Sequence, residues 1–162
     1  MRSLSILAGL ASLAAADPRP EPFEVLKRAA LDDCLRDSGV PTTATNSVAP
    51  FNRRVPYTPV AVAVPTTLGH IQAAVVCGTK NRVKINAKGG GHSYSSLGLG
   101  GENGHLVINL ERMNGVKLDP DTGEARVQGG ARVGHVATQL YSLGRRALPH
   151  GTCPRSVRTR RR

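Results

Sequence analysis

Residues 59–94 read PVAVAVPTTLGHIQAAVVCGTKNRVKINAKGGGHSY, and the pattern of this stretch decides the fold. The apolar run at 60–64 is continuous and ends at a proline, which is typical of a strand buried on both faces. Two threonines that can cap a helix follow, and apolar residues then recur at helical spacing at 68–75, with Gly78 near the end of the helix. Apolar and polar residues alternate at 83–87, which indicates a second strand. These segments predict a strand–helix–strand unit with parallel strands and a right-handed crossover.

The second strand runs directly into Lys88-Gly89-Gly90-Gly91-His92-Ser93-Tyr94. Three consecutive glycines remove every side chain where the backbone must turn, and they let backbone N–H groups approach an anion such as a phosphate. The segment is neither a GxGxxG fingerprint nor a P-loop. A flexible turn explains the glycines equally well, and His92 can equally be a turn histidine bonded to a backbone carbonyl. The residues alone therefore leave the role of this loop open.

Further short elements follow the glycine-rich stretch. Apolar runs predict strands at 106–110, 116–118 and 125–127, and helical spacing of Val133, Val136, Leu140 and Leu143 predicts a helix closed by Gly144. A strong turn sequence lies at 119–123, and the last of these strands ends on Gly129-Gly130. The fold class is therefore α+β, with a mixed sheet that contains the strand–helix–strand unit.

The N-terminus has the features of a secretory signal peptide at 1–16. A positive Arg2 precedes an apolar run at 4–13, and small alanines follow it. The run is too short to cross a membrane, so we expect a secreted, extracellular protein with no membrane partner. Residues 17–30 are proline-rich and then charged, which favours a mobile lead-in before a short helix at 31–35.

The formal net charge of +11 comes largely from the end of the chain, where five arginines lie in the final eight residues. Aromatic residues, which single-strand nucleic-acid binders use as stacking platforms, make up only 3% of the chain. We therefore expect no nucleic-acid partner. A secreted cationic protein that binds polyanions without catalysis remains an alternative.

The chain contains three cysteines, Cys34, Cys77 and Cys153. In an oxidising compartment two of them are expected to pair, which leaves the third to be explained. No CxxC pair or Cys/His spacing indicates a zinc site, so we expect no metal.

Four motifs carry a resemblance to a known family. They are 59–65 with the following helix, Lys88-Gly89-Gly90-Gly91-His92-Ser93-Tyr94, Gln128-Gly129-Gly130-Ala131 and Pro149-His150-Gly151-Thr152-Cys153-Pro154. Residues 57–154 resemble the PCMH-type FAD-binding domain of fungal oligosaccharide oxidases and berberine-bridge-enzyme-like proteins. The resemblance divides the chain into a signal peptide at 1–16, a lead-in at 17–56, an incomplete FAD-binding domain at 57–154 and an unrelated tail at 155–162.

The resemblance implies a covalently bound FAD. His92 occupies the position of the histidine bonded to the flavin 8α-methyl group, and Cys153 that of the cysteine bonded to flavin C6. The cofactor would be lined by the glycine loop with its flanking residues and by the second glycine pair, namely Gly89, Gly90, Gly91, Ser93, Tyr94, Gly129 and Gly130. The resemblance also implies a disulfide between Cys34 and Cys77, which accounts for the third cysteine.

The family reaction oxidises the anomeric carbon of an oligosaccharide to a lactone, and molecular oxygen then takes the electrons from the flavin to give hydrogen peroxide. The catalytic base of the relatives, a tyrosine, belongs to their C-terminal half, so no catalytic residue is assigned here. A family member that acts on an alkaloid or a small alcohol is an alternative, because the residues that choose the substrate also lie in that half.

After Pro154 the sequence departs from the family and continues as an arginine-rich segment, 155–162. We expect a truncated chain that lacks the substrate-binding part and is inactive as written. Such a chain would leave sheet edges and apolar faces uncovered.

Overall fold

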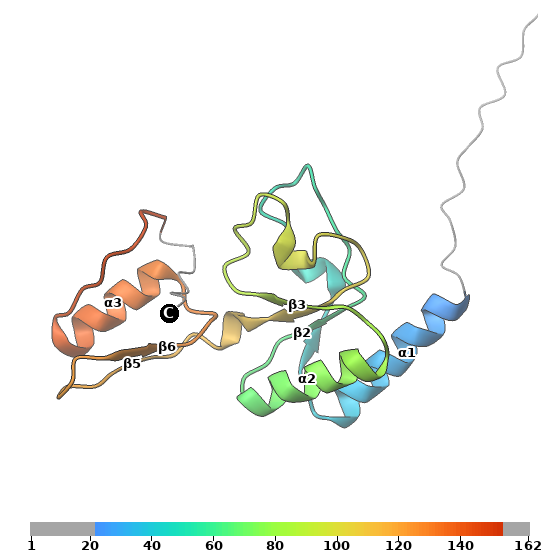
Figure 1. The fold of residues 1–162 in the computed structure, drawn as a ribbon, viewed down its shortest axis with the longest axis horizontal. Helices are drawn as coiled ribbons and strands as arrows, with labels where there is room; N and C mark the ends of the chain where they lie inside the picture. The colour runs from blue at the N-terminus through green and yellow to red at the C-terminus, as the bar shows by residue number, and fades with distance from the viewer. Residues whose placement is uncertain (1–21, 154–162) are drawn as a thin grey trace, which may run out of the picture.

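The structure, a computed structural model, describes residues 22–153. The predicted signal peptide and the arginine-rich tail lie outside these residues. Figure 1 shows two groups of elements joined by a narrow connection: a four-stranded sheet with two helices, and a hairpin with one helix. Helices and a mixed sheet are both present, which confirms the predicted α+β class.

The first sheet has the strand order β1-β2-β4-β3. Its strands are β1 (Thr42–Thr43), β2 (Ala61–Ala63), β3 (Ile85–Lys88) and β4 (Leu106–Asn109). β2 and β3 are both parallel to β4, whereas β1 is antiparallel to β2. The predicted parallel strand–helix–strand unit is therefore present, with one difference. β4 lies between the two strands of the unit, because β2 and β3 each pair with it.

The two faces of this sheet are covered by different parts of the chain. On one face Ala61 and Ala63 of β2 pack in a core with residues of α1 (Pro22–Asp37) and α2 (Leu68–Lys80). On the other face Val62 packs against residues from the connecting loops, such as Leu99. Successive strand residues point to opposite faces, and both faces are buried here. This explains why the sequence of β2 is apolar without alternation.

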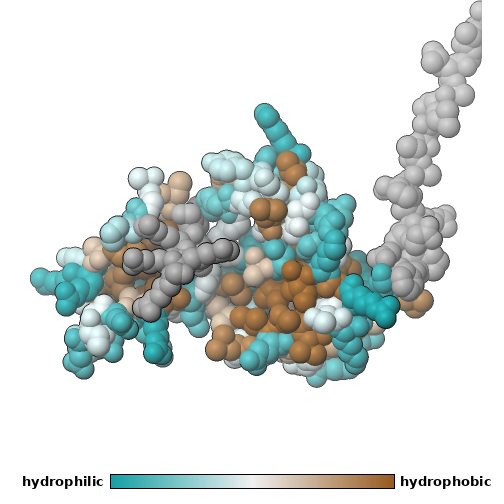
Figure 2. All heavy atoms as spheres, in the orientation of Figure 1, coloured by the Kyte–Doolittle hydropathy of each residue, from teal (hydrophilic) through white to brown (hydrophobic). Residues whose placement is uncertain are grey.

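α2 begins where the sequence predicts. Thr67 is its N-cap residue, and its side-chain oxygen accepts a hydrogen bond of 3.2 Å from the backbone N–H of His70. Leu68, Val75 and Val76 of this helix are exposed. Figure 2 shows a hydrophobic patch in the region of α1 and α2. Some of the apolar side chains of α2 therefore face solvent instead of the core.

α1 corrects the prediction for the N-terminal segment. The expected mobile lead-in at 17–30 is helical from Pro22 onward, and the helix continues to Asp37. A proline is tolerated in the first turn of a helix, and Leu31 and Leu35, one turn apart, are fully buried. Two ion pairs on the helix surface, Arg28–Asp32 and Arg36–Asp33, account for charges that suggested a loop.

The second group of elements is a hairpin packed on one helix. β5 (Val116–Leu118) and β6 (Ala125–Val127) are antiparallel, and α3 (Val133–Gly144) packs against them. The side-chain oxygen of Asp119 accepts hydrogen bonds from the backbone N–H groups of Asp121 and Thr122 and so holds the predicted turn. These two bonds lower the pKa of the Asp119 carboxyl group.

α3 is apolar on one face, with Val133, Val136 and Leu140 buried as predicted. Leu143 was expected on the same face, but it is half exposed. The hairpin residue Leu118 lies instead against Gly144, the last residue of the helix. Within the described residues, no helix is long and apolar enough to cross a membrane.

A disulfide between Cys34 and Cys77 joins α1 to α2, with the two Cα atoms 5.7 Å apart. The pairing implied by the family resemblance is confirmed. Cys77 is buried in the core between the helices and the sheet, beside Leu31 and Leu35. The bond therefore fastens the N-terminal helix to the sheet that it covers.

Removal of this disulfide by the double substitution Cys34→Ala/Cys77→Ala is expected to lower the free energy of unfolding by about 4 kcal/mol, because the bond closes a long loop in the unfolded chain. Urea denaturation followed by circular dichroism measures the change. Cys153→Ala is the matched control, and its stability should equal that of the unsubstituted chain because Cys153 is exposed. Equal stability of the double variant and the control would contradict a structural role for the bond.

Candidate cofactor site

The candidate site begins at the carboxyl end of β3, where the chain enters the glycine loop, defined here as Gly89–Tyr94. β3 and β4 are parallel neighbours, so the glycine loop lies at the same edge of the sheet as the segment that follows β4. In open sheets with parallel strands, ligands bind at this edge. The loop is therefore placed where the strand order allows a cofactor to approach.

Gly91 is the glycine whose backbone requires the absence of a side chain. Its φ of +72° is in the left-handed region, and a Cβ atom there would lie 2.9 Å from Cε of Lys88. Ser93 holds the far side of the loop, since its hydroxyl oxygen accepts a hydrogen bond from the backbone N–H of Leu97, in the short 3₁₀ helix Leu97–Leu99. Contacts at Gly91 and Ser93 therefore hold this turn.

His92 lies against an aromatic residue from a distant part of the sequence. Its ring stacks on Phe51, with ring centroids 4.7 Å apart and an interplanar angle of 29°. Tyr94 meets the same Phe51 edge to face at 5.4 Å, and its carbonyl oxygen accepts a hydrogen bond of 2.8 Å from the side-chain amide of Asn52. Phe51 and Asn52 therefore hold the orientation of the glycine loop.

The sequence analysis missed Phe51 and Asn52, because they lie about 40 residues from the loop in a polar, turn-like segment. Phe51 is one of only two phenylalanines in the chain. A phenylalanine in an otherwise polar, turn-like segment was the available signal. It indicates a contact but does not indicate with which residue.

Lys88, the last residue of β3, is buried beneath the glycine loop with only 8% of its surface exposed. Its side chain lies close to Gly91 and to Gly98. Burial lowers the pKa of the Lys88 ammonium group, the positive charge of Arg132 lowers it further, and the carboxylate of Glu111 acts in the opposite direction. Lys88 was quoted in the motif, but it was not predicted as a site residue.

The second glycine pair, Gly129-Gly130, joins the hairpin to α3 and touches the segment that follows β4. A Cβ atom on Gly130 would lie 1.6 Å from the carbonyl oxygen of Leu110, so no other residue fits without a shift of the backbone. The Gly130 N–H donates to the carbonyl oxygen of Met113 at 2.9 Å. This contact brings the start of α3 to the edge of the sheet that carries the glycine loop.

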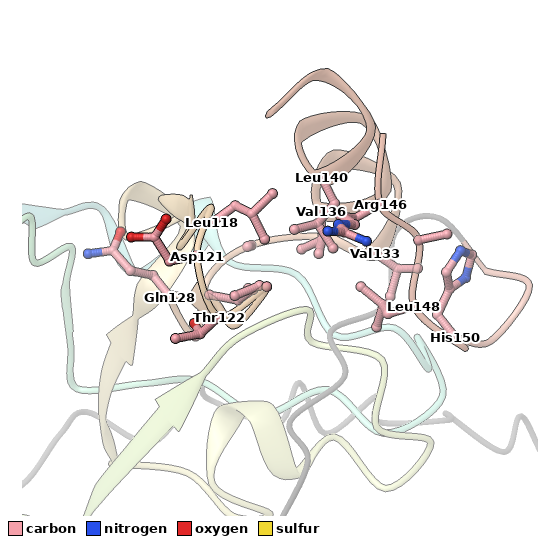
Figure 3. A pocket seen from close by; sticks show the side chains of 16 residues that line it. Leu118, Asp121, Thr122, Gln128, Val133, Val136, Leu140, Arg146, Leu148 and His150 are labelled. Carbon is pink, nitrogen blue, oxygen red and sulfur yellow. The ribbon is translucent and has the colours of Figure 1, made fainter. Parts of the chain in front are cut away.

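A cavity of about 810 Å³ lies between the hairpin and α3 (Figure 3). Apolar residues of α3, among them Val136 and Leu140, form one wall, and Thr122 and Gln128 of the hairpin lie across from them. Gly129 is the one predicted site residue in its lining, which also includes His150. The cavity therefore adjoins the second glycine pair, and residues of the glycine loop are absent from its described lining.

Cys153 is exposed and lies at the last described position, in the segment that follows α3. The two residues expected to carry the flavin thus come from different parts of the fold, His92 from the loop after β3 and Cys153 from the segment after α3. Among the residues from 22 to 153, no group of three metal-ligating side chains is present.

Comparison with known families places the site in context. Residues 59–157 match the family described as FAD binding domain, and both His92 and Cys153 lie within the match. The chain belongs to the FAD-binding domain family. The matched residues include β2, α2, the glycine loop and the Gly129-Gly130 pair, which are the elements that form the candidate site.

Oligosaccharide oxidases are among the similar proteins. The solved structure of xylooligosaccharide oxidase from Myceliophthora thermophila, in complex with xylobiose, is 57% identical with a TM-score of 0.76, and the match covers 79% of this chain and 28% of that one. Chitooligosaccharide oxidase of Gibberella zeae is 50% identical over 92% of this chain and 30% of its own length. The glucooligosaccharide oxidase of Acremonium strictum, 44% identical with a TM-score of 0.76 over 79% of this chain and 28% of that one, carries a 6-S-cysteinyl, 8α-N1-histidyl FAD.

These matches establish the fold and show how much of each relative the chain covers. It spans about 30% of the length of these relatives, within their FAD-binding domain. The predicted membership of the PCMH-type FAD-binding fold is confirmed, since the matched structures superpose on most of the chain.

The contact between Gly130 and Leu110 generates a direct test. Gly130→Ala is expected to lower the free energy of unfolding by more than about 4 kcal/mol, because the added methyl group overlaps the Leu110 carbonyl. Chemical denaturation measures the loss. Gly69→Ala, in the first turn of α2, is the control: its Cβ would have an ordinary 3.7 Å contact, and the better helix propensity of alanine should preserve or raise stability. A Gly130→Ala chain as stable as this control would show that the junction is not tightly packed.

Proposed function

We propose that this chain is the FAD-binding part of a secreted, flavin-dependent oxidase that acts on oligosaccharides. The observation that carries the proposal is the glycine loop, which turns over a buried lysine at the carboxyl end of β3 and holds His92 against Phe51. The family match and the names of the relatives support the cofactor and the class of substrate.

The described residues fit an FAD molecule. The absence of a side chain at Gly91 lets the loop lie against Lys88, and the backbone N–H groups of Gly89–Ser93 would meet an anionic group of the cofactor. Gly129 and Gly130 would line the cofactor where α3 begins, and Tyr94, which is largely exposed, would lie at its outer side. The chain provides the cradle, and the flavin, when bound, supplies the two-electron redox chemistry.

In this proposal His92 bonds to the flavin 8α-methyl group and Cys153 to flavin C6. The glucooligosaccharide oxidase with a cysteinyl and histidyl FAD supports the two residue types. Stacking on Phe51 restricts rotation of the His92 ring, so that a ring nitrogen can be held toward one partner. Two attachment points from different parts of the fold would restrict the cofactor without any further closing element.

The complete reaction would be the oxidation of the anomeric carbon of an oligosaccharide to a lactone, with oxygen as the electron acceptor and hydrogen peroxide as the product. The catalytic base and the substrate-binding part are not assigned to residues of this chain. The Cys34–Cys77 disulfide supports the proposed secretion, because such bonds persist in oxidising compartments.

Covalent attachment can be tested on the chain itself after incubation with FAD. With folding verified by circular dichroism, the flavin is expected to stay with the protein after acid precipitation. The added mass should be that of one FAD less two hydrogen atoms for each bond, because each attachment leaves the flavin reduced and dissolved oxygen re-oxidises it. His92→Ala and Cys153→Ala should each retain flavin through the remaining bond, whereas the double variant should release all of it. His135→Ala, on the exposed side of α3, is the control and should behave like the unsubstituted chain. Complete release of flavin from the folded, unsubstituted chain would refute covalent attachment.

A further inference from the structure

The chain contains two asparagine–glycine pairs, Asn103-Gly104 and Asn114-Gly115. Such a pair can modify itself without an enzyme, because glycine has no side chain to hinder its backbone nitrogen. That nitrogen attacks the side-chain amide carbon of the asparagine, a new N–C bond closes a cyclic imide, and the amide nitrogen leaves with the displaced proton as ammonia. Water then opens the ring at either of its carbonyl carbons, which gives aspartate or isoaspartate. The contacts of each pair decide whether the two reacting atoms can meet.

The first pair is held at both of its reacting groups. The side-chain oxygen of Asn103 accepts a hydrogen bond of 2.8 Å from the backbone N–H of Thr58. The N–H of Gly104 donates to the carbonyl oxygen of the same Thr58 at 2.9 Å. The side-chain amide and the attacking nitrogen are therefore both fixed to a neighbouring segment of backbone.

The second pair is held at only one of its reacting groups. The backbone N–H of Gly115 donates a hydrogen bond of 2.7 Å to the side-chain oxygen of Gln128. The side chain of Asn114 is exposed and forms no hydrogen bond with any residue that the structure describes. Asn103 is exposed as well, so exposure does not distinguish the two pairs, whereas the hydrogen bonds do.

We propose that Asn114 is a site of spontaneous deamidation and that the side chain of Gln128 controls its rate. The attack requires the Gly115 nitrogen to lose its proton and to turn toward Asn114. The hydrogen bond to Gln128 opposes both changes, because it stabilises the intact N–H group and holds the peptide plane in place. This modification is independent of the proposed cofactor, and it gives Gln128, the first residue of the second glycine motif, a role of its own.

The modified position lies between two residues that are bonded to the segment before α3. The carbonyl oxygen of Met113 accepts from the N–H of Gly130 at 2.9 Å, and the carbonyl oxygen of Gly115 accepts from the N–H of Gln128 at 2.9 Å. Isoaspartate carries the chain through its side-chain carbon and so adds a backbone atom between these two acceptors, whereas aspartate adds none. Gly130 has no room to follow a shift, because it packs against the backbone after β4. Isoaspartate at this position should therefore loosen the junction between the sheet and the hairpin.

The experiment incubates the full chain at mildly alkaline pH, with folding verified by circular dichroism, and follows both pairs by mass spectrometry of their peptides. Asn114 is expected to deamidate first, while Asn103 in the same sample stays intact. In concentrated urea, where the contacts of the fold are lost, the two sites should react at similar rates. Equal rates in the folded chain, or a faster reaction at Asn103, would overturn the proposal.

Gln128→Met tests the control of the rate, because methionine keeps the length of the side chain and removes the amide oxygen. The rate at Asn114 is expected to rise about 2- to 12-fold, the range for loss of one neutral hydrogen bond, and the rate at Asn103 should not change. Gln72→Met, at an exposed position of α2, is the matched control and should leave both rates unchanged. An unchanged rate at Asn114 in the folded Gln128→Met chain refutes the role of Gln128.

The effect on the junction is tested with the two products. Asn114→Asp, which has the aspartate product without an added backbone atom, should melt at the same temperature as the unsubstituted chain. The isoaspartate form, separated from the aspartate form by chromatography, should melt at a lower temperature. Identical melting of the isoaspartate form and the Asn114→Asp chain would show that the junction tolerates the longer backbone and would contradict this part of the proposal.

Discussion

β4 is the strand on which the remaining structure depends. All four of its residues are buried, and it pairs with β2 on one side and β3 on the other. Because both pairings are parallel, the carboxyl ends of β3 and β4 meet at one edge. That edge carries the glycine loop after β3 and, after β4, the backbone of Leu110 against which Gly130 packs. The sheet pairing thus directs two glycine motifs, about 40 residues apart in the sequence, to the same edge of the sheet.

Local patterns predicted most elements of this fold correctly. The continuous apolar run of β2, the capped helix that follows it and the turn that begins at Asp119 each depend on neighbouring residues, and each lies where the sequence places it. The position of β4 between β2 and β3 was not predicted, because strand order depends on contacts between distant segments. α1 was misjudged because its charges suggested a loop, whereas Leu31 and Leu35 bury one face of a helix.

In the candidate site, too, features set by neighbouring residues were predicted and contacts between distant segments were not. The glycine residues and His92 were predicted from their motif, and the structure explains two of the glycines sterically, because a Cβ atom on Gly91 or Gly130 would lie too close to neighbouring atoms. The residues that support them were not identified, since Phe51 reaches His92 across a long separation in sequence. Lys88 was overlooked for another reason. Its burial depends on Gly91 and Gly98 folding over it, and a lysine at the end of a strand is otherwise expected to be exposed.

The disulfide between α1 and α2 also concerns the order in which the chain is synthesised. Cys34 and Cys77 both precede the glycine loop, so in the oxidising compartment that the proposed secretion implies they would emerge before the flavin-binding residues. Once they are paired, these two thiols no longer compete in exchange with a cysteine that arrives later. Cys153 is the last of the three to emerge, when its possible disulfide partners are already paired. The order of the cysteines along the chain therefore separates the one that would carry a cofactor from the two that hold the fold together.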